Sequence, residues 1–93
     1  METLIQKEVA QEYLQELKET LERNSISVEV IGMLFGCTFY VAFFSCTRQD
    51  EVGEVRLSIN QSSISISNFQ KNKSCVLMTE DLQFIANTVN DYF

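Results

Sequence analysis

Apolar residues recur at helical spacing over the first part of the chain. Successive residues of a helix are turned by about 100°, so side chains three or four positions apart share a face. With that spacing, residues 2–23 collect one apolar stripe: Ile5, Val9, Ala10, Tyr13, Leu14, Leu17 and Leu21. The opposite face collects glutamates: Glu8, Glu12, Glu16, Glu19 and Glu22. The pattern predicts a long amphipathic helix over residues 2–23.

Alternation of apolar and polar residues follows this helix and predicts strands. Alternating stretches cover residues 26–30, 55–60 and 64–67, and residues 75–78 are either a short last strand or the lead-in to a helix. Residues 37–48 are the most apolar stretch, and both of their alternating faces are apolar. A strand of this kind is typical of the centre of a sheet that is covered on both sides.

A second helix is predicted after residue 78. Thr79 suits its N-cap position, and Glu80 and Asp81 suit the positive end of the helix dipole. Its apolar stripe consists of Leu82, Ile85, Ala86, Val89, Tyr92 and Phe93. Phe84 lies off this stripe.

Together these patterns predict an α+β fold with an N-terminal helix, an antiparallel sheet of four to five strands and a C-terminal helix. No internal repeat or low-complexity linker divides the chain, so residues 1–93 are expected to form a single compact domain. The two helix stripes and one apolar sheet face favour a two-layer sandwich with both helices on the same side of the sheet.

Composition argues against catalysis. The chain contains no His, so it lacks the usual general base and the commonest metal ligand. Cys37, Cys46 and Cys75 have no C-x-x-C spacing, and carboxylate pairs such as Asp50 with Glu54 are expected to be solvated turn charges. We therefore expect a non-enzymatic protein without cofactor or metal, with reduced cysteines in the cytoplasm.

The charge balance indicates the kind of partner. The chain has 13 Asp and Glu against 7 Lys and Arg, a net charge of −6. Such a chain repels phosphate backbones, so the expected partner is a protein with a basic surface and not nucleic acid. No apolar run reaches the ~20 residues of a membrane-spanning helix, and no membrane contact is expected.

Two acidic surfaces are candidates for binding this partner. One is the glutamate face of the first helix, and the other is the turn with Asp50, Glu51 and Glu54. Glu80 and Asp81 add further carboxylates. The alternative for the helix glutamates is a solvated outer face that keeps the protein soluble.

Aromatic side chains in residues 37–48 form another candidate contact surface. The face with Phe39 and Phe43 is expected to lie in the core. The other face, with Tyr40 and Phe44, then needs a cover. That cover is either more of the same chain, the second copy of a homodimer or another protein.

Phe84 and the serine-rich residues 58–67 are further candidates. Phe84, set among carboxylates, is either an anchor inside an acidic rim or an ordinary surface phenylalanine. The serine-rich hairpin is either an edge that accepts a partner strand or a solvated hairpin.

In size, charge and layout, the whole chain resembles two groups of small acidic binding proteins, although it matches no family motif and neither group assigns a residue-level site. One group is the phage-encoded inhibitors of bacterial defence, including anti-CRISPR proteins, several of which occupy the DNA-binding cleft of a nuclease. The other is the type III secretion chaperones, which are dimeric and hold effectors on hydrophobic patches; this chain is shorter than those chaperones.

The first resemblance implies a protein-binding inhibitor in the cytoplasm of a host bacterium, whose acidic surface blocks the nucleic-acid-binding groove of a nuclease. The second implies a small dimeric chaperone or structural interaction protein that uses the aromatic strand face.

Overall fold

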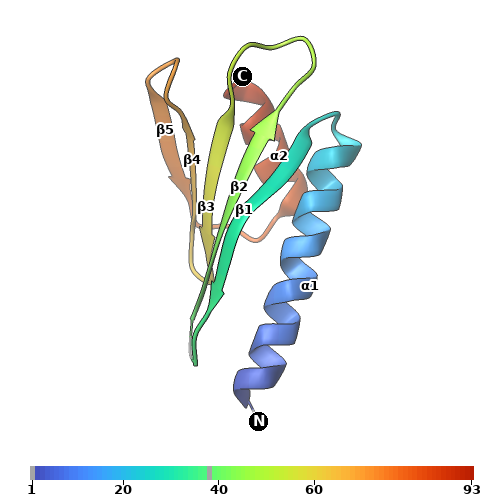
Figure 1. Ribbon diagram of the computed structural model, residues 1–93, viewed down its shortest axis with the longest axis vertical. Coiled ribbons are helices and arrows are strands. Elements are labelled where there is room, and N and C mark those ends of the chain that lie inside the picture. Colours follow the sequence, from blue (N-terminus) through green and yellow to red (C-terminus); the bar gives the residue numbers. More distant parts are fainter. Residues whose placement is uncertain (1, 38) are drawn as a thin grey trace.

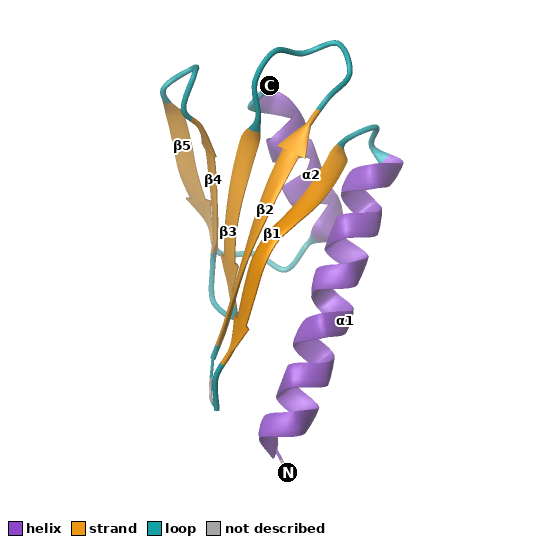
Figure 2. Cartoon of the chain, viewed as in Figure 1, coloured by secondary structure: helices purple, strands orange, loops and turns teal. Residues whose placement is uncertain are grey.

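A five-stranded antiparallel sheet forms one layer of the protein, and both helices lie on the same side of it (Figure 1 and Figure 2). The computed structural model describes residues 2–37 and 39–93, with side chains from residue 8 onward. The elements are α1 (Glu2–Arg23), β1 (Ser27–Phe35), β2 (Tyr40–Thr47), β3 (Val55–Asn60), β4 (Ile64–Asn68), β5 (Lys73–Leu77) and α2 (Leu82–Asp91). The strands lie in sequence order, β1-β2-β3-β4-β5. The predicted α+β fold and its helix–sheet–helix order are confirmed.

The register of the strands aligns apolar side chains on the face that meets the helices. Phe44 lies opposite Leu57, and Leu57 lies opposite Ile66. Directly opposed residues project to the same side of a sheet, so these side chains form a continuous dry row. Helix residues complete the core from the other side: Leu14, Leu17, Leu21, Ile85, Ala86 and Val89.

The predicted apolar stripe of α1 is the side that packs on the sheet. Its buried members are Ala10, Leu14, Leu17 and Leu21. Val9, nearer the start of the helix, is 58% exposed, and Ile5 lies outside the described side chains. Burial on the described part of the stripe therefore begins in the middle of α1.

α2 begins two residues later than the sequence suggests. Asp81, and not Thr79, is the N-cap, because its carboxylate accepts a hydrogen bond from the main-chain N–H of Phe84 at 3.1 Å. The Thr79 hydroxyl oxygen in turn accepts from the N–H of Asp81 at 3.1 Å. Thr79 therefore holds the cap residue in place from outside the helix.

The two faces of β2 are the reverse of those expected. Phe44 is 1% exposed, whereas Phe43 is 45% exposed. The strand register explains this orientation, because Phe44 is paired with Leu57 while Phe43 is paired with Ser58 on the polar side of β3. The strand face with Tyr40 and Phe44, which was expected to need a cover, thus packs against this chain's own helices.

Candidate functional site

A groove of about 670 Å³ opens where the β1–β2 connection, the β3–β4 turn and the first half of α1 meet. These segments lie together in the lower half of Figure 1. We call this feature the aromatic groove. Its described lining comes from Val9, Ala10 and Tyr13 of α1, residues 35–37 and 39–40 of the first hairpin, residues 60–64 of the second, and residues 78–80 before α2.

Aromatic rings dominate one wall of the groove. The centroids of the Phe35 and Tyr40 rings are 6.2 Å apart, with the ring planes tilted by 31°. The Phe39 ring lies directly against Gly36, where a Cβ atom would collide with it. Tyr13 faces this wall from α1. The absence of a side chain at Gly36 therefore sets the position of one ring of the groove.

Glu80 is the one charged side chain among the described residues of the groove. Burial, together with the nearby phenol of Tyr40 and the carboxylate of Glu80, raises the pKa of Tyr13 to about 12. Burial, followed by the charge of Glu80, also raises the pKa of Tyr40. The Glu80 carboxylate therefore acts on both phenols, and the groove carries negative potential beside π-electron faces.

Amide side chains hold the rim of the groove. The Gln61 carbonyl oxygen accepts a hydrogen bond from the main-chain N–H of Tyr40 at 3.2 Å. The Asn60 side-chain oxygen accepts from the N–H groups of Ser62 and Ser63 at 2.8 and 2.9 Å. These bonds fix the β3–β4 turn and join it to the first residue of β2.

The glutamate face of α1 is exposed from Glu8 to Glu22. Glu8, Glu12, Glu16, Glu19 and Glu22 are all exposed. Gln15 donates a hydrogen bond to Glu19, and no ion pair joins these glutamates to any described cationic side chain. The helix therefore presents a row of carboxylates to solvent without neutralising partners among the side chains that the structure describes.

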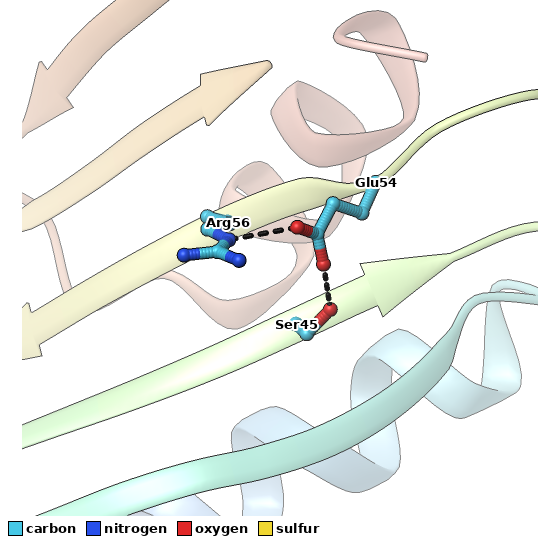
Figure 3. A network of polar contacts seen from close by, with 3 residues as sticks. All are labelled: Ser45, Glu54 and Arg56. Carbon is cyan, nitrogen blue, oxygen red and sulfur yellow. Dashed lines mark hydrogen bonds and ion pairs between the residues drawn. The ribbon is translucent and has the colours of Figure 1, made fainter. Parts of the chain in front are cut away.

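The predicted acidic turn divides into two parts. Asp50 and Glu51 are exposed. Glu54 instead accepts hydrogen bonds from the Ser45 hydroxyl and, at 2.8 Å, from Nε of Arg56 (Figure 3). Those two bonds hold the pKa of the Glu54 carboxyl below its usual range, against a small effect of burial. Glu54 is therefore tied to the neighbouring strands, unlike the other two carboxylates.

Carboxylates at the start of α2 also have separate roles. Asp81 caps the helix, as described above, while Glu80 lines the aromatic groove. Phe84 is 50% exposed, which agrees with its predicted place outside the apolar stripe of α2. Its role as an anchor for a partner stays a prediction.

The sheet face away from the helices carries a second apolar surface. Leu34 is opposite Val41, and Leu34 and Phe43 are 60% and 45% exposed. The rest of this outer sheet face is mostly polar, with Ser58 next to Phe43 on β3. We call Leu34, Val41 and Phe43 the outer apolar patch.

The serine-rich hairpin is not a sheet edge. It consists of β3 and β4, and β4 pairs with β5 throughout, from Ile64 with Leu77 to Asn68 with Lys73. The edges are β1 and β5. The possibility that this hairpin accepts a partner strand at a free edge is therefore wrong, because β5 already occupies that edge.

Three predicted contact residues thus have unexpected surroundings. Phe44 is in the core, Tyr40 lines the aromatic groove and Glu54 is bound to Ser45 and Arg56. The sequence does not indicate that Tyr13 lines a groove, because Tyr13 lies in the apolar stripe of α1, which is only partly covered at this residue.

Neither a metal centre nor a membrane-spanning helix is found in the described part of the chain. Among the side chains described from residue 8 onward, no three Cys, Asp or Glu are grouped to hold a metal. No helix within residues 2–37 and 39–93 is long and apolar enough to cross a bilayer. Cys37 is exposed, Cys75 is half-buried and Cys46 is buried. No family model, curated protein or solved structure is significantly similar to this chain.

Proposed function

We propose that this protein is a non-enzymatic inhibitor that binds a larger nucleic-acid-handling protein, such as a nuclease, through the glutamate face of α1. The observation that carries the proposal is the row of exposed glutamates on that helix, without a cationic partner among the described side chains. Carboxylates on a rigid helix present negative charge to a basic groove at a smaller ordering cost than a flexible acidic tail.

The spacing of these charges supports the same proposal. Glu8 and Glu12, and Glu12 and Glu16, are four residues apart on the helix. Like charges at this spacing destabilise a helix by about 0.2–0.5 kcal/mol per pair. A surface that served solubility alone would gain from lysines at some of these positions, whereas a surface that replaces the phosphates of a nucleic acid needs the repulsive row.

Charge reversal tests the proposal. Tagged protein captures the partner from a bacterial lysate, and the captured protein is then challenged with labelled duplex DNA or RNA. We expect the nucleic acid and this protein to exclude one another. We also expect the triple variant Glu12→Lys, Glu16→Lys, Glu19→Lys to lose capture, with the corresponding Gln variants intermediate.

A second variant separates the two acidic surfaces. Asp50→Lys with Glu51→Lys changes the turn and leaves Glu54 in its hydrogen bonds with Ser45 and Arg56. Circular dichroism verifies that each variant is folded. A partner that binds the α1 triple variant normally, or that holds nucleic acid while bound to this protein, would contradict the proposal.

The outer apolar patch favours a second candidate function, a dimeric chaperone-like or structural interaction protein. Phe43 and Leu34 are large apolar side chains exposed on neighbouring strands, a feature typical of contact surfaces. Sedimentation equilibrium over a concentration series tests this candidate. Phe43→Lys should abolish self-association, and Val52→Lys, at an 85% exposed loop residue, is the matched control.

A further inference from the structure

The aromatic groove is separate from the exposed glutamate row, and the proposed function does not use it. Its volume of about 670 Å³ lies within the range of about 300–1,000 Å³ that is typical of ligand sites in proteins. This volume can hold more than one side chain of a peptide. The groove therefore has the size of a binding site in its own right.

We propose that the aromatic groove receives an arginine-bearing segment of the partner protein, with the guanidinium group between the Tyr13 and Tyr40 rings and the Glu80 carboxylate. This inference rests on the proposed function in one respect: the segment belongs to the same basic partner that the α1 glutamates attract.

The charges of the groove select a cation. Glu80 is its one charged described side chain, and no described Lys or Arg forms an ion pair with it. Tyr13 and Tyr40 add two ring faces whose quadrupoles attract cations. A phosphate group would meet only repulsion from Glu80, which makes nucleic acid an unfavourable occupant.

The geometry favours arginine over lysine. A guanidinium group is planar, stacks on aromatic rings and can donate two hydrogen bonds to one carboxylate, whereas an ammonium group acts as a point charge. The tilted rings of Phe35 and Tyr40, with the Glu80 carboxylate in the same groove, offer both kinds of contact. The arginine side chain thus matches the groove in shape as well as in charge.

Exposed apolar side chains around the groove favour a peptide and not a free small cation. Val9 is 58% exposed, Met78 is 80% exposed and Phe39 is 46% exposed. These side chains can pack against apolar residues on either side of the arginine in an extended segment. A free cation would leave them in water.

The test uses a blocked tripeptide, Leu-Arg-Leu, titrated into the isotopically labelled full chain and followed by NMR. The same peptide with citrulline in place of arginine is the neutral control, since citrulline keeps the shape and loses the charge. We expect amide shifts at Tyr40, Gln61 and Glu80 with the arginine peptide. Citrulline should weaken binding at least about tenfold, the loss expected for a charge-assisted hydrogen bond.

Variants of the protein complete the test. Glu80→Gln should weaken the arginine peptide at least about tenfold, while Glu51→Gln, an equal change of charge at an exposed residue of another loop, should leave it within about twofold. Bound peptide should also slow alkylation of Cys37, which lines the groove. The inference would be overturned if the groove residues showed no amide shifts. It would also be overturned if the citrulline peptide bound as tightly as the arginine peptide, or if Glu80→Gln bound the arginine peptide as tightly as the wild type.

These outcomes are separable from those of the proposed function. The tripeptide test needs neither the partner nor the α1 glutamates. If the peptide binds the groove and the α1 charge reversal leaves partner capture intact, the inhibitor proposal fails alone. If charge reversal abolishes capture and the peptide does not bind, the groove inference fails alone.

Discussion

Phe43 and Phe44 are neighbours on β2, yet 45% of Phe43 is exposed while only 1% of Phe44 is. Successive side chains of a strand point to opposite faces of the sheet, so this pair marks the boundary between the core and the outer sheet face. Phe44 packs in the core cluster, and Phe43 belongs to the outer apolar patch. A phenylalanine side chain therefore belongs to the core at position 44 and to the exposed surface at position 43.

The first prediction follows from this pair. Phe44→Ala should lower the free energy of unfolding by about 3–5 kcal/mol, because it opens a cavity in the core. Phe43→Ala should change it by only about 0.5 kcal/mol, as is usual at exposed positions. Urea unfolding followed by circular dichroism measures both. If Phe44→Ala does not fold, Phe44→Leu provides the milder comparison, and equal effects at the two positions would contradict the face assignment.

Asn68 is the basis of the second prediction. This side chain is 1% exposed; its Nδ2 donates to the main-chain oxygen of Tyr92 at 2.8 Å, and its Oδ1 accepts from the N–H of Lys71. Asn68→Ala leaves the main-chain oxygen of Tyr92 and the N–H of Lys71 without these part-buried bonds and should cost about 1–3 kcal/mol. Asn87→Ala, at an exposed residue of α2, should cost at most about 0.5 kcal/mol. Similar losses in the two variants would contradict a structural role for Asn68.

The fold was largely predictable because its signals are local. The glutamates and leucines of α1 alternate with helical period, and the β3 and β4 strands alternate apolar residues with serine. The sequence favours Thr79 as the N-cap of α2, although the N-cap is Asp81. Both side chains can accept a hydrogen bond from a main-chain N–H, and the sequence does not decide between two such nearby residues. Local periodicity is therefore a better guide to elements than to their ends.

The site was less predictable because it depends on contacts between distant segments. Both faces of β2 are apolar, so only pairing with β3 decides that Phe44 is buried and Phe43 is not. Likewise, Tyr13, Tyr40 and Glu80 are far apart in the sequence and meet only in the folded chain. A single sequence predicts neither the register of β2 against β3 nor the proximity of these three side chains.

The third prediction concerns pH and Glu54. Hydrogen bonds from Ser45 and Arg56 lower the pKa of Glu54 in the folded state, so they stabilise the fold above the ordinary pKa of 4.5. This contribution is lost as the pH falls through the lowered folded-state pKa. NMR titration of the carboxyl carbon should show Glu54 titrating below 4.5.

Variants check the cause of this shift. Ser45→Ala should raise the pKa of Glu54 toward its ordinary value, and Ser58→Ala, on the same sheet face, should leave it unchanged. The difference in unfolding free energy between wild type and Ser45→Ala should shrink at acid pH. A pKa of Glu54 that does not respond to Ser45→Ala would show that the hydroxyl is not a cause.

The fourth prediction ranks the thiols. Cys37 is exposed, whereas Cys46 is buried, and burial, aided by the charge of Glu54, raises the pKa of Cys46 to about 12. The thiolate is the reactive form, so Cys46 should react with a disulfide reagent only after unfolding. Cys37 should react first and half-buried Cys75 more slowly. Loss of the fast phase in Cys37→Ser would verify the assignment, and a fast phase that remains in this variant would contradict it.

The last prediction concerns the tyrosines and alkaline pH. The pKa of Tyr13 is raised to about 12, whereas a tyrosine in the unfolded chain has a pKa of about 10. A raised folded-state pKa means that its contribution to stability is complete below about pH 10 and is lost as the pH rises toward about 12. Tyr13→Phe should therefore lose less stability than wild type over this interval.

Glu80→Gln tests the placement of the carboxylate beside the two groove phenols. Removing its charge should lower the pKa of Tyr13 and Tyr40, because Glu80 contributes to raising both. Tyr92 is the internal control, since a hydrogen bond with Cys75, followed by burial, raises its pKa without Glu80. NMR titration of the labelled tyrosine ring carbons resolves the three phenols. Unchanged pKa values for Tyr13 and Tyr40 in Glu80→Gln would place the carboxylate away from the rings and remove the electrostatic basis for a cation in the groove.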